Sequence, residues 1–451
     1  MGCGASLGTR YKKDDDGGVL AEYEHEQTWA TPVEQIGVGQ RISVINDVDE
    51  FRVLRKSDLS GHVTLYVAGG KNKKPVQYAS EQRGLCAHEQ PRHSEKCPFC
   101  PGNEHKTPQN VLVYDAKALG TTLSEQEALA GWVLRVFPNI FPMMICPVAY
   151  YGEGYSRSLA NISHSVVAEG LHANHKVSSS GKQVDALGVS EVVVESPVHN
   201  ALFALQQPDR IELLLRALVS RGQALAQQSW AKQILYFKQY GSLSGGSLVH
   251  PHTQILSLPI VPPPLLARLE YSLYSYEKKG RRCATCFRCV EEFAGEQSER
   301  SRHVHSTKYF VVSVPYSSGS QYCMQIAPKR HSSNFCDATV DELRDLSKLM
   351  ALLSQVLYTG FDDPSYNMFI RSAPVQFPVH LRGRDISAAD TAKCFHWIME
   401  LRPRFPADVG GFEIASGVRV VSGLPEDHAE QLRALVQDRI KAGIAPIGEA
   451  R

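Results

Sequence analysis

The chain has 451 residues, more than one hydrophobic core usually supports, so we expect two domains or one fold built from two similar halves. Its 48 Lys and Arg residues nearly balance its 47 Asp and Glu residues, and the net charge of +1 argues against nucleic acid as a partner. Hydrophobic residues make up 43%, which excludes disorder throughout the chain. No secretory signal or run of about 18 apolar residues appears, which predicts a cytoplasmic protein. Eleven cysteines and 17 histidines then favour metal binding or catalysis over disulfides.

The amino-terminal residues fit a lipidation signal. Gly2 is placed for myristoylation, and the adjacent Cys3 is a candidate for palmitoylation. Two acyl chains hold a protein on a membrane stably, whereas one does not. We therefore expect residues 1–40 to form a flexible tail that tethers the protein to a membrane if both residues are acylated, and the alternative is a tail without lipid.

The first half, predicted over residues 41–264, begins with strands such as 63–67. Residues 152–188 are rich in Ser, Gly, His and Asn without periodicity, which predicts a surface insertion. Apolar residues at helical intervals predict a helix over 211–232. A strand, a flexible Gly/Ser loop and an extended segment should follow, at 234–237, 241–247 and 248–256.

The second half, predicted over residues 265–451, repeats this order of parts. A helix over 265–277 opens it, and a Cys-x-x-Cys, a strand, a long helix and a further strand follow. The long helix is expected at 340–358. Two copies of one unit predict an α+β fold with two tandem halves, each an antiparallel sheet with packed helices.

Two sets of cysteines and histidines have metal-ligand character. Cys97 and Cys100 are spaced so that both thiolates can bind one ion, although a pair of small buried residues is the alternative. His199 and His250 lie at the ends of segments that should pair in one sheet, and they would complete a Cys₂His₂ site.

The second set contains Cys283, Cys286, His331 and His396. Cys289 leaves an alternative, because Cys286 and Cys289 have the same spacing, but we prefer the earlier pair. Either set would saturate zinc without an open position, so both sites are expected to be structural and to contribute to the folding free energy. Iron is the alternative metal in the second site.

The segment His250-Pro-His252-Thr-Gln254 is the most specific feature of the chain. In an extended strand, alternate residues share a face, so His250, His252 and Gln254 should project into one cleft. A neutral imidazole is a competent nucleophile towards phosphorus, and we expect His252 to attack the α-phosphate of a nucleotide sugar. A buried structural role is the alternative for His252. Gln254 and the loop at 241–247 are then candidate donors to phosphate oxygens.

The chain resembles the galactose-1-phosphate uridylyltransferase family, a branch of the histidine-triad superfamily, over roughly residues 45–435. The resemblance rests on CPFCPGNE, RVFPNIFP, VVVESPVHN, GSLSGGSLVHPHTQ, APKRHSSNF, FHWIMELRPR and GGFEI. It implies two histidine-triad-like halves, His250 as a zinc ligand and His252 as the nucleophile, with Gln254 orienting the phosphoryl group. It also implies that substrate is contacted by Asn139, Gly246, Ser247 and the residue at position 239. The chain departs from the family there, because Gln239 stands where asparagine is usual.

The resemblance implies transfer of UMP between UDP-glucose and galactose 1-phosphate through a nucleotidyl-histidine in a ping-pong mechanism. It also implies a homodimer, which is common in the family. Because only His396 remains of the histidines in the family's second metal segment, the chain also resembles the branch with ADP-glucose phosphorylase, which uses phosphate as the acceptor. Ile398 stands where the second half would carry a nucleophile, so one nucleophile per chain is expected. A hydrolase of dinucleotides and a non-catalytic zinc-stabilised binding protein are the remaining alternatives.

Overall fold

The computed structural model describes most of the chain between residues 90 and 443 and a few short strands before it. The described ranges are 10–13, 19–22, 51–57, 63–68, 90–115, 125–151, 167–168, 176–178, 181–278, 280–288, 301–405 and 410–443. Within them, no helix is long and apolar enough to cross a bilayer. Gly2 and Cys3 lie outside these ranges.

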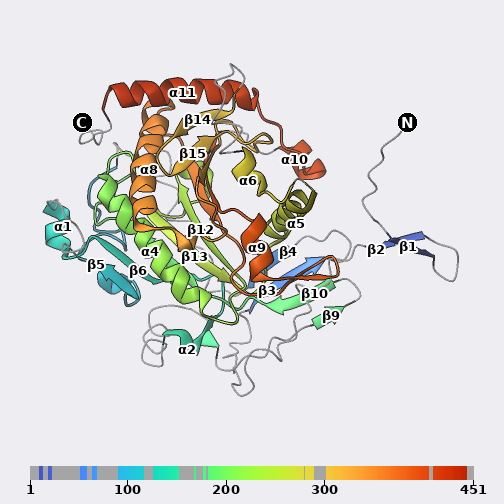
Figure 1. The fold of residues 1–451 in the computed structure, drawn as a ribbon. Coiled ribbons are helices and arrows are strands. Elements are labelled where there is room, and N and C mark those ends of the chain that lie inside the picture. The colour runs from blue at the N-terminus through green and yellow to red at the C-terminus, as the bar shows by residue number, and fades with distance from the viewer. Residues whose placement is uncertain are drawn as a thin grey trace.

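A ten-stranded antiparallel sheet forms the centre of the molecule (Figure 1). Five strands come from the first half of the chain, and their bounds are β5 (Leu112–Tyr114), β6 (Leu134–Pro138), β11 (Ser190–Val194), β12 (Gln233–Tyr240) and β13 (His252–Leu258). Five come from the second half, namely β14 (His303–Ser306), β15 (Phe310–Ser313), β16 (Met324–Pro328), β17 (Tyr366–Arg371) and β20 (Ile398–Pro403).

The two sets of strands have the same order. From the outer edge inwards the sheet runs β5-β6-β11-β13-β12 on one side and β14-β15-β16-β20-β17 on the other, so in each set the fifth strand lies between the third and the fourth. The fourth strands meet in the middle, where Phe237 pairs with Phe369. The α+β class is as predicted, and the repeated strand order fits the expected pair of similar units.

Two long helices cover one face of this sheet. In Figure 1, α4 (Pro208–Ala226) and α8 (Val340–Gly360) lie side by side in front of the strands. Their apolar sides bury leucines such as Leu218 and Leu353 in one core with the strand residues Val193 and Ile255. Burial of these side chains is the main stabilising term for both helices. A third helix, α11 (Pro425–Lys441), packs against α8 and the edge strand β14.

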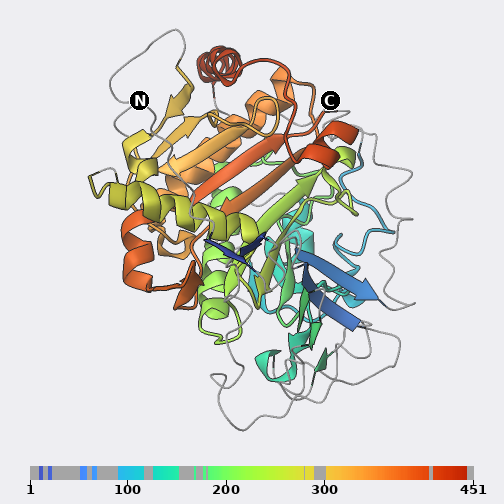
Figure 2. The same cartoon turned by 90° about the vertical axis from the view of Figure 1, so that its right-hand side faces the viewer.

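The opposite face, turned towards the viewer in Figure 2, carries smaller elements. The helix α5 (Pro263–Lys278) shares a core with α9 (Ala388–Cys394) and with the hairpin of β18 (Val379–Leu381) and β19 (Arg384–Ile386). A four-stranded sheet has the order β4-β3-β10-β9, with bounds β3 (Phe51–Ser57), β4 (Val63–Ala68), β9 (Lys176–Ser178) and β10 (Gly181–Asp185).

The remaining elements are short. They are β1 (Arg10–Lys13), β2 (Val19–Glu22), β7 (Cys146–Pro147), β8 (Val167–Ala168), α1 (Glu125–Ala130), α2 (Val148–Tyr151), α6 (Ala284–Cys286) and α10 (Gly411–Ser416), with 3₁₀ turns η4 (Glu104–Lys106), η6 (Ser242–Ser244) and η8 (Phe335–Asp337). The hairpin of β1 and β2 falls in the segment expected to be a flexible tail. The domain boundaries stay predictions.

Three element predictions need correction. The helix expected to reach residue 232 ends at Ala226, because the chain turns back to the sheet, where the Lys232 N–H donates to the Leu258 carbonyl. The stretch 152–188 contains β10, which pairs with β3. The described part of this stretch is therefore not a simple surface insertion. The strand expected from residue 248 begins only at His252, so the alternation argument holds for His252 and Gln254 but not for His250.

Candidate metal centres and nucleophile

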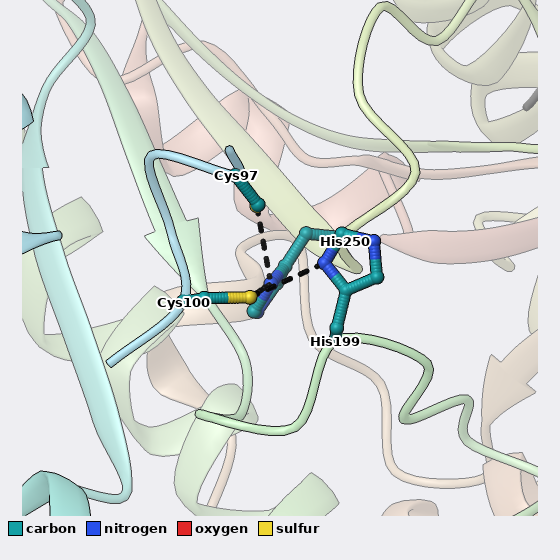
Figure 3. Close-up of side chains that lie close together, drawn as sticks. All are labelled: Cys97, Cys100, His199 and His250. Carbon is teal, nitrogen blue, oxygen red and sulfur yellow. Dashed lines mark hydrogen bonds between the residues drawn. The ribbon is translucent and has the colours of Figure 1, made fainter. Parts of the chain in front are cut away.

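The four residues of the first predicted metal set lie together (Figure 3). Their ligand atoms are all within 4.8 Å of one another, and all four side chains are buried. The Cys100 Sγ lies 3.3 Å from His199 Nδ1 and 3.6 Å from His250 Nδ1, and the Cys97 Sγ is also 3.6 Å from His250 Nδ1. The two cysteines share a tight turn, in which the Cys100 N–H donates to the Cys97 carbonyl.

A backbone carbonyl fixes the orientation of His250. The His250 Nε2 lies 2.8 Å from the Ser196 oxygen, and because a carbonyl only accepts, Nε2 carries the hydrogen. The Nδ1 lone pair therefore faces the two sulfur atoms. Burial lowers the pKa of His250, which favours the neutral ring that a metal ligand requires.

A hydrogen bond joins the two thiols of this cluster. A hydrogen bond with Cys97 is the main cause that lowers the pKa of Cys100 to about 2, and its contacts with His199 and His250 act in the same direction. The same hydrogen bond, together with burial, raises the pKa of Cys97. Two thiolates and two imidazole nitrogens are the donor set of closed tetrahedral zinc sites, so the chemistry of these residues fits that metal.

The second predicted set repeats this geometry. The ligand atoms of Cys283, Cys286, His331 and His396 also lie within 4.8 Å of one another. The Cys286 Sγ is 3.2 Å from His331 Nδ1 and 3.3 Å from His396 Nδ1. Cys289, the alternative ligand, lies outside the described residues.

Backbone carbonyls orient both histidines of the second set as well. The His396 Nε2 donates to the Pro328 carbonyl at 2.9 Å, and the His331 Nε2 donates to the Ala392 carbonyl at 2.7 Å. Pro328 precedes His331 by three residues, as Ser196 precedes His199. His250 and His396 are therefore oriented by the same local arrangement, whereas His199 Nε2, unlike His331 Nε2, has no hydrogen-bond partner among the described residues.

His252 opens strand β13 next to the first cluster. Its Nδ1 lies 2.8 Å from the His250 carbonyl, so Nδ1 carries the hydrogen and the lone pair is on Nε2. The ring is only 7% exposed and meets the Phe99 ring edge to face at 5.4 Å between centroids. Phe99 belongs to the Cys97–Cys100 turn, so His252 lies on the side of the sheet that carries the metal cluster, away from α4 and α8. The half-buried Gln254 shares that side.

The Gly/Ser loop is held at the junction of the two halves. The Gln239 Nε2 donates to the Ser244 carbonyl at 3.2 Å, and the Asn367 Nδ2 donates to the same oxygen at 3.0 Å. Gly241 has a φ of 79° and lies so close to Ser365 that a Cβ would meet its Oγ at 2.2 Å, so only glycine fits there. Gln239, which departs from the family pattern, thus binds the loop itself.

The other predicted substrate contacts lie in the Gly/Ser loop and after the end of β6. Gly246 is buried and packs against the backbone of Gln239, while Ser247 is half-buried in the same loop. Asn139 follows the end of β6, and its Oδ1 accepts a hydrogen bond from the Phe141 N–H at 2.9 Å. Asn367, which supports the loop from the second half, was missed because only the β12–β17 pairing brings it there.

Comparisons with known proteins agree with this fold and with the family resemblance. The chain is 26% identical to ADP-glucose phosphorylase of Arabidopsis thaliana over 400 residues, which cover 88% of this chain and 96% of that protein. It is 28% identical to galactose-1-phosphate uridylyltransferase of Thermotoga maritima, over 58% of this chain and 78% of that protein. A family model described as the N-terminal domain of DUF4931, a domain of unknown function, matches residues 185–261.

Solved structures of similar proteins have the same fold. A GALT-like protein from Arabidopsis thaliana superposes with a TM-score of 0.56 at 25% identity, covering 76% of this chain and 93% of that one. The ADP-glucose phosphorylase of Arabidopsis thaliana, solved with bound ADP-glucose, has a TM-score of 0.56 at 24% identity and covers 84% and 98% of the two chains.

Fold and site together define an α+β protein with two Cys₂His₂ clusters that can hold metal ions. The first cluster is fully buried and lies beside an oriented histidine. The comparisons confirm the resemblance to the galactose-1-phosphate uridylyltransferase family, including its ADP-glucose phosphorylase-like members.

Proposed function

We propose that the protein is a hexose-1-phosphate nucleotidyltransferase that works through a nucleotidyl-His252 intermediate. The observation that carries the proposal is the hydrogen bond from His252 Nδ1 to the His250 carbonyl, because it leaves the lone pair on Nε2. His250 is itself held by Ser196 and by the cysteine cluster, so the nucleophile sits next to a rigid anchor.

The reaction has two displacements. In the first, the His252 Nε2 lone pair forms a bond to the α-phosphorus of a nucleotide sugar, and the sugar 1-phosphate leaves with the electrons of the broken P–O bond. In the second, an oxygen of an acceptor phosphate attacks the same phosphorus, and the P–N bond electrons return to Nε2. The hydrogen stays on His252 Nδ1 and is donated to the His250 carbonyl oxygen, which stabilises the positive charge of the substituted ring. Gln254 and the loop with Gly246 and Ser247 donate to the phosphate oxygens, and Asn139 contacts the nucleotide.

Zinc is proposed for both clusters, with iron as the alternative in the second. A zinc ion with four protein ligands has no open position for substrate, so its contribution is to fix His250 and the strands around it. The proposed catalytic steps therefore belong to this chain's own residues. Homodimerisation and acylation of Gly2 and Cys3 stay predictions.

Two donor and acceptor pairs fit this chemistry. The sequence motifs favour UMP transfer between UDP-glucose and galactose 1-phosphate. The length of the match favours the other pair, because ADP-glucose phosphorylase aligns over 88% of this chain and the uridylyltransferase of Thermotoga maritima over 58%. With ADP-glucose, the products would be glucose 1-phosphate and, after attack by inorganic phosphate, ADP.

Intact-protein mass spectrometry after exposure to ADP-glucose or UDP-glucose tests the proposal. A mass gain of one AMP or one UMP would identify both the donor and the covalent mechanism. His252→Gly should abolish the gain and keep the metal content, whereas His380→Gly, on the β18–β19 hairpin, should behave as wild type. An adduct that persists in His252→Gly would refute the assigned nucleophile.

A further inference from the structure

A buried ion pair lies behind the strand that carries His252. The Lys238 Nζ is 2.8 Å from both carboxylate oxygens of Glu195, and the Thr253 Oγ1 donates to Glu195 Oε1 at 2.6 Å. The side chains of Lys238 and Glu195 are only 1% and 2% exposed. Lys238 Nζ also lies 4.7 Å from the centroid of the Phe203 ring. The charges are therefore paired with each other in a nearly water-free environment.

These three side chains point to the helix-covered face of the sheet. Side chains alternate along a strand, and Val193 and Ile255, each two residues from a member of the group, pack in the core under α4 and α8. The group therefore lies on the opposite side of the sheet from His252 and makes no contact with a substrate bound there.

The second half has no such group at the equivalent positions. By strand register, Lys238 pairs with Thr253, and in the second half Ile370 pairs with Met399. Thr253 follows His250 by three residues, as Met399 follows His396. Ile370 and Met399 are 2% and 0% exposed, so an apolar pair fills the same place. The fold is thus built without the ion pair in one half.

A contribution to folding stability does not explain this ion pair, because replacing a buried ion pair with apolar residues is often neutral or stabilising. The position of its residues beside those of the candidate site explains it better. Glu195 adjoins Ser196, whose carbonyl holds His250, and Thr253 adjoins His252. Lys238 adjoins Gln239, which binds the Gly/Ser loop. The Glu195 carboxylate, directly after the end of β11, therefore connects this strand to β12 and β13 beside the residues of the candidate site.

We infer that the Glu195–Lys238–Thr253 group is a positioning device that fixes His252 relative to its metal-bound neighbour and to the phosphate loop. The inference rests on the proposed function. A displaced nucleophile slows attack more than it weakens substrate binding, because the rate depends on a near-attack geometry. Loss of the group should therefore lower kcat and leave KM and metal content nearly unchanged.

The double variant Glu195→Gln/Lys238→Met tests this, because it removes both charges together and leaves no unpaired buried ion. Formation of the nucleotidyl-protein adduct in a single turnover should slow by about ten- to a hundredfold. The matched control is Glu127→Gln/Arg210→Met, which removes another buried ion pair, at 3.0 Å, between α1 and α4. The control should form the adduct at the wild-type rate.

Thr253 gives a second, milder test. Thr253→Val removes only the hydrogen bond to Glu195 and should slow adduct formation, while Thr253→Ser keeps the hydroxyl and should restore the rate. A wild-type rate in Glu195→Gln/Lys238→Met, or an equal slowing in the control pair, would overturn the positioning role. A wild-type chain that forms an adduct with neither nucleotide sugar would overturn the proposed function as well.

Discussion

At the residue scale, backbone carbonyls fix which ring nitrogen carries the hydrogen in His250, His252 and His396. Ser196 and Pro328 accept from the Nε2 atoms of His250 and His396, so Nδ1 is the atom offered to the sulfurs in both clusters. For His252 the carbonyl of His250 accepts from Nδ1 instead, and Nε2 keeps its lone pair. In the proposed mechanism, the nitrogen that donates to a carbonyl thus sets whether a histidine is suited to be a metal ligand or a nucleophile.

Removing one thiolate from either cluster should remove one metal ion. Wild-type protein is expected to bind two zinc ions per chain, and Cys97→Ser and Cys283→Ser are each expected to bind one, because both sites need four donors. Elemental analysis of the purified variants measures this. Both variants should also unfold at lower temperature, since metal binding contributes to folding. Two ions retained in either variant would contradict the four-ligand assignment.

The metal residues show what the sequence could predict at this scale. Cys-x-x-Cys spacing and the HPH segment indicated Cys97, Cys100, Cys283, Cys286 and His250, because these patterns are local. The other three cluster histidines were assigned from the order of the segments and from the family resemblance, and they are His199, His331 and His396. The Glu195–Lys238 contact spans 43 residues and depends on strand register, so no local pattern indicated it. Gln239 was predicted at a substrate-contact position although asparagine is usual there. Its hydrogen bond to the Ser244 carbonyl depends on the conformation of the loop, which the sequence pattern does not indicate.

At the element scale, α8 owes its beginning to a capping box. The Thr339 hydroxyl accepts from the Glu342 N–H, and the Glu342 carboxylate accepts from the Thr339 N–H. Thr339→Ala should lower the free energy of unfolding by about 1 kcal/mol. Denaturant unfolding measures this, with Thr359→Ala near the other end of the helix as the control. Equal loss in the two variants would argue against a specific cap.

Glu342 also makes stability depend on pH. Burial raises the pKa of this carboxyl, but hydrogen bonds from Arg330 and the Thr339 N–H outweigh that effect and leave the pKa below its ordinary value. A depressed carboxyl pKa contributes stability that is present above the unfolded value, about 4.3, and is lost as the pH falls through the folded value. The stability difference between wild type and Glu342→Gln should therefore shrink as the pH falls below about 4.3. A constant difference from pH 7 to pH 3 would exclude this linkage.

Long periodic elements were predicted better than short ones. The helix expected at 340–358 is α8, at Val340–Gly360, because its apolar spacing is a local signal. The strand β10 has a polar sequence, GKQVD, and is held in the sheet by pairing with β3 and β9. Pairing between distant segments is a tertiary effect, which composition does not encode.

At the scale of the whole molecule, the two similar halves carry different residues at equivalent positions. Ile398, at the place of His252, is fully buried with Val311 and Ala327. The chain between β17 and β20 forms the β18–β19 hairpin and α9, where the first half has the Gly/Ser loop. The first half therefore carries the whole proposed transfer, and the second half supports it through Asn367.

A histidine moved to the second half should not restore activity. The double variant His252→Gly/Ile398→His is expected to form no nucleotidyl adduct, because position 398 lacks both open space and a phosphate loop. Intact mass after exposure to ADP-glucose and UDP-glucose measures this. Adduct formation by this variant, when His252→Gly alone forms none, would show that the second half retains a usable site.

The pairing of β12 with β17 has a consequence for any attempt to divide the chain. A half produced alone would end its sheet at one of these two inner strands, with a row of backbone N–H and C=O groups open to other molecules. Such a fragment would dimerise or aggregate through the open strand. Each half therefore covers an edge strand of the other.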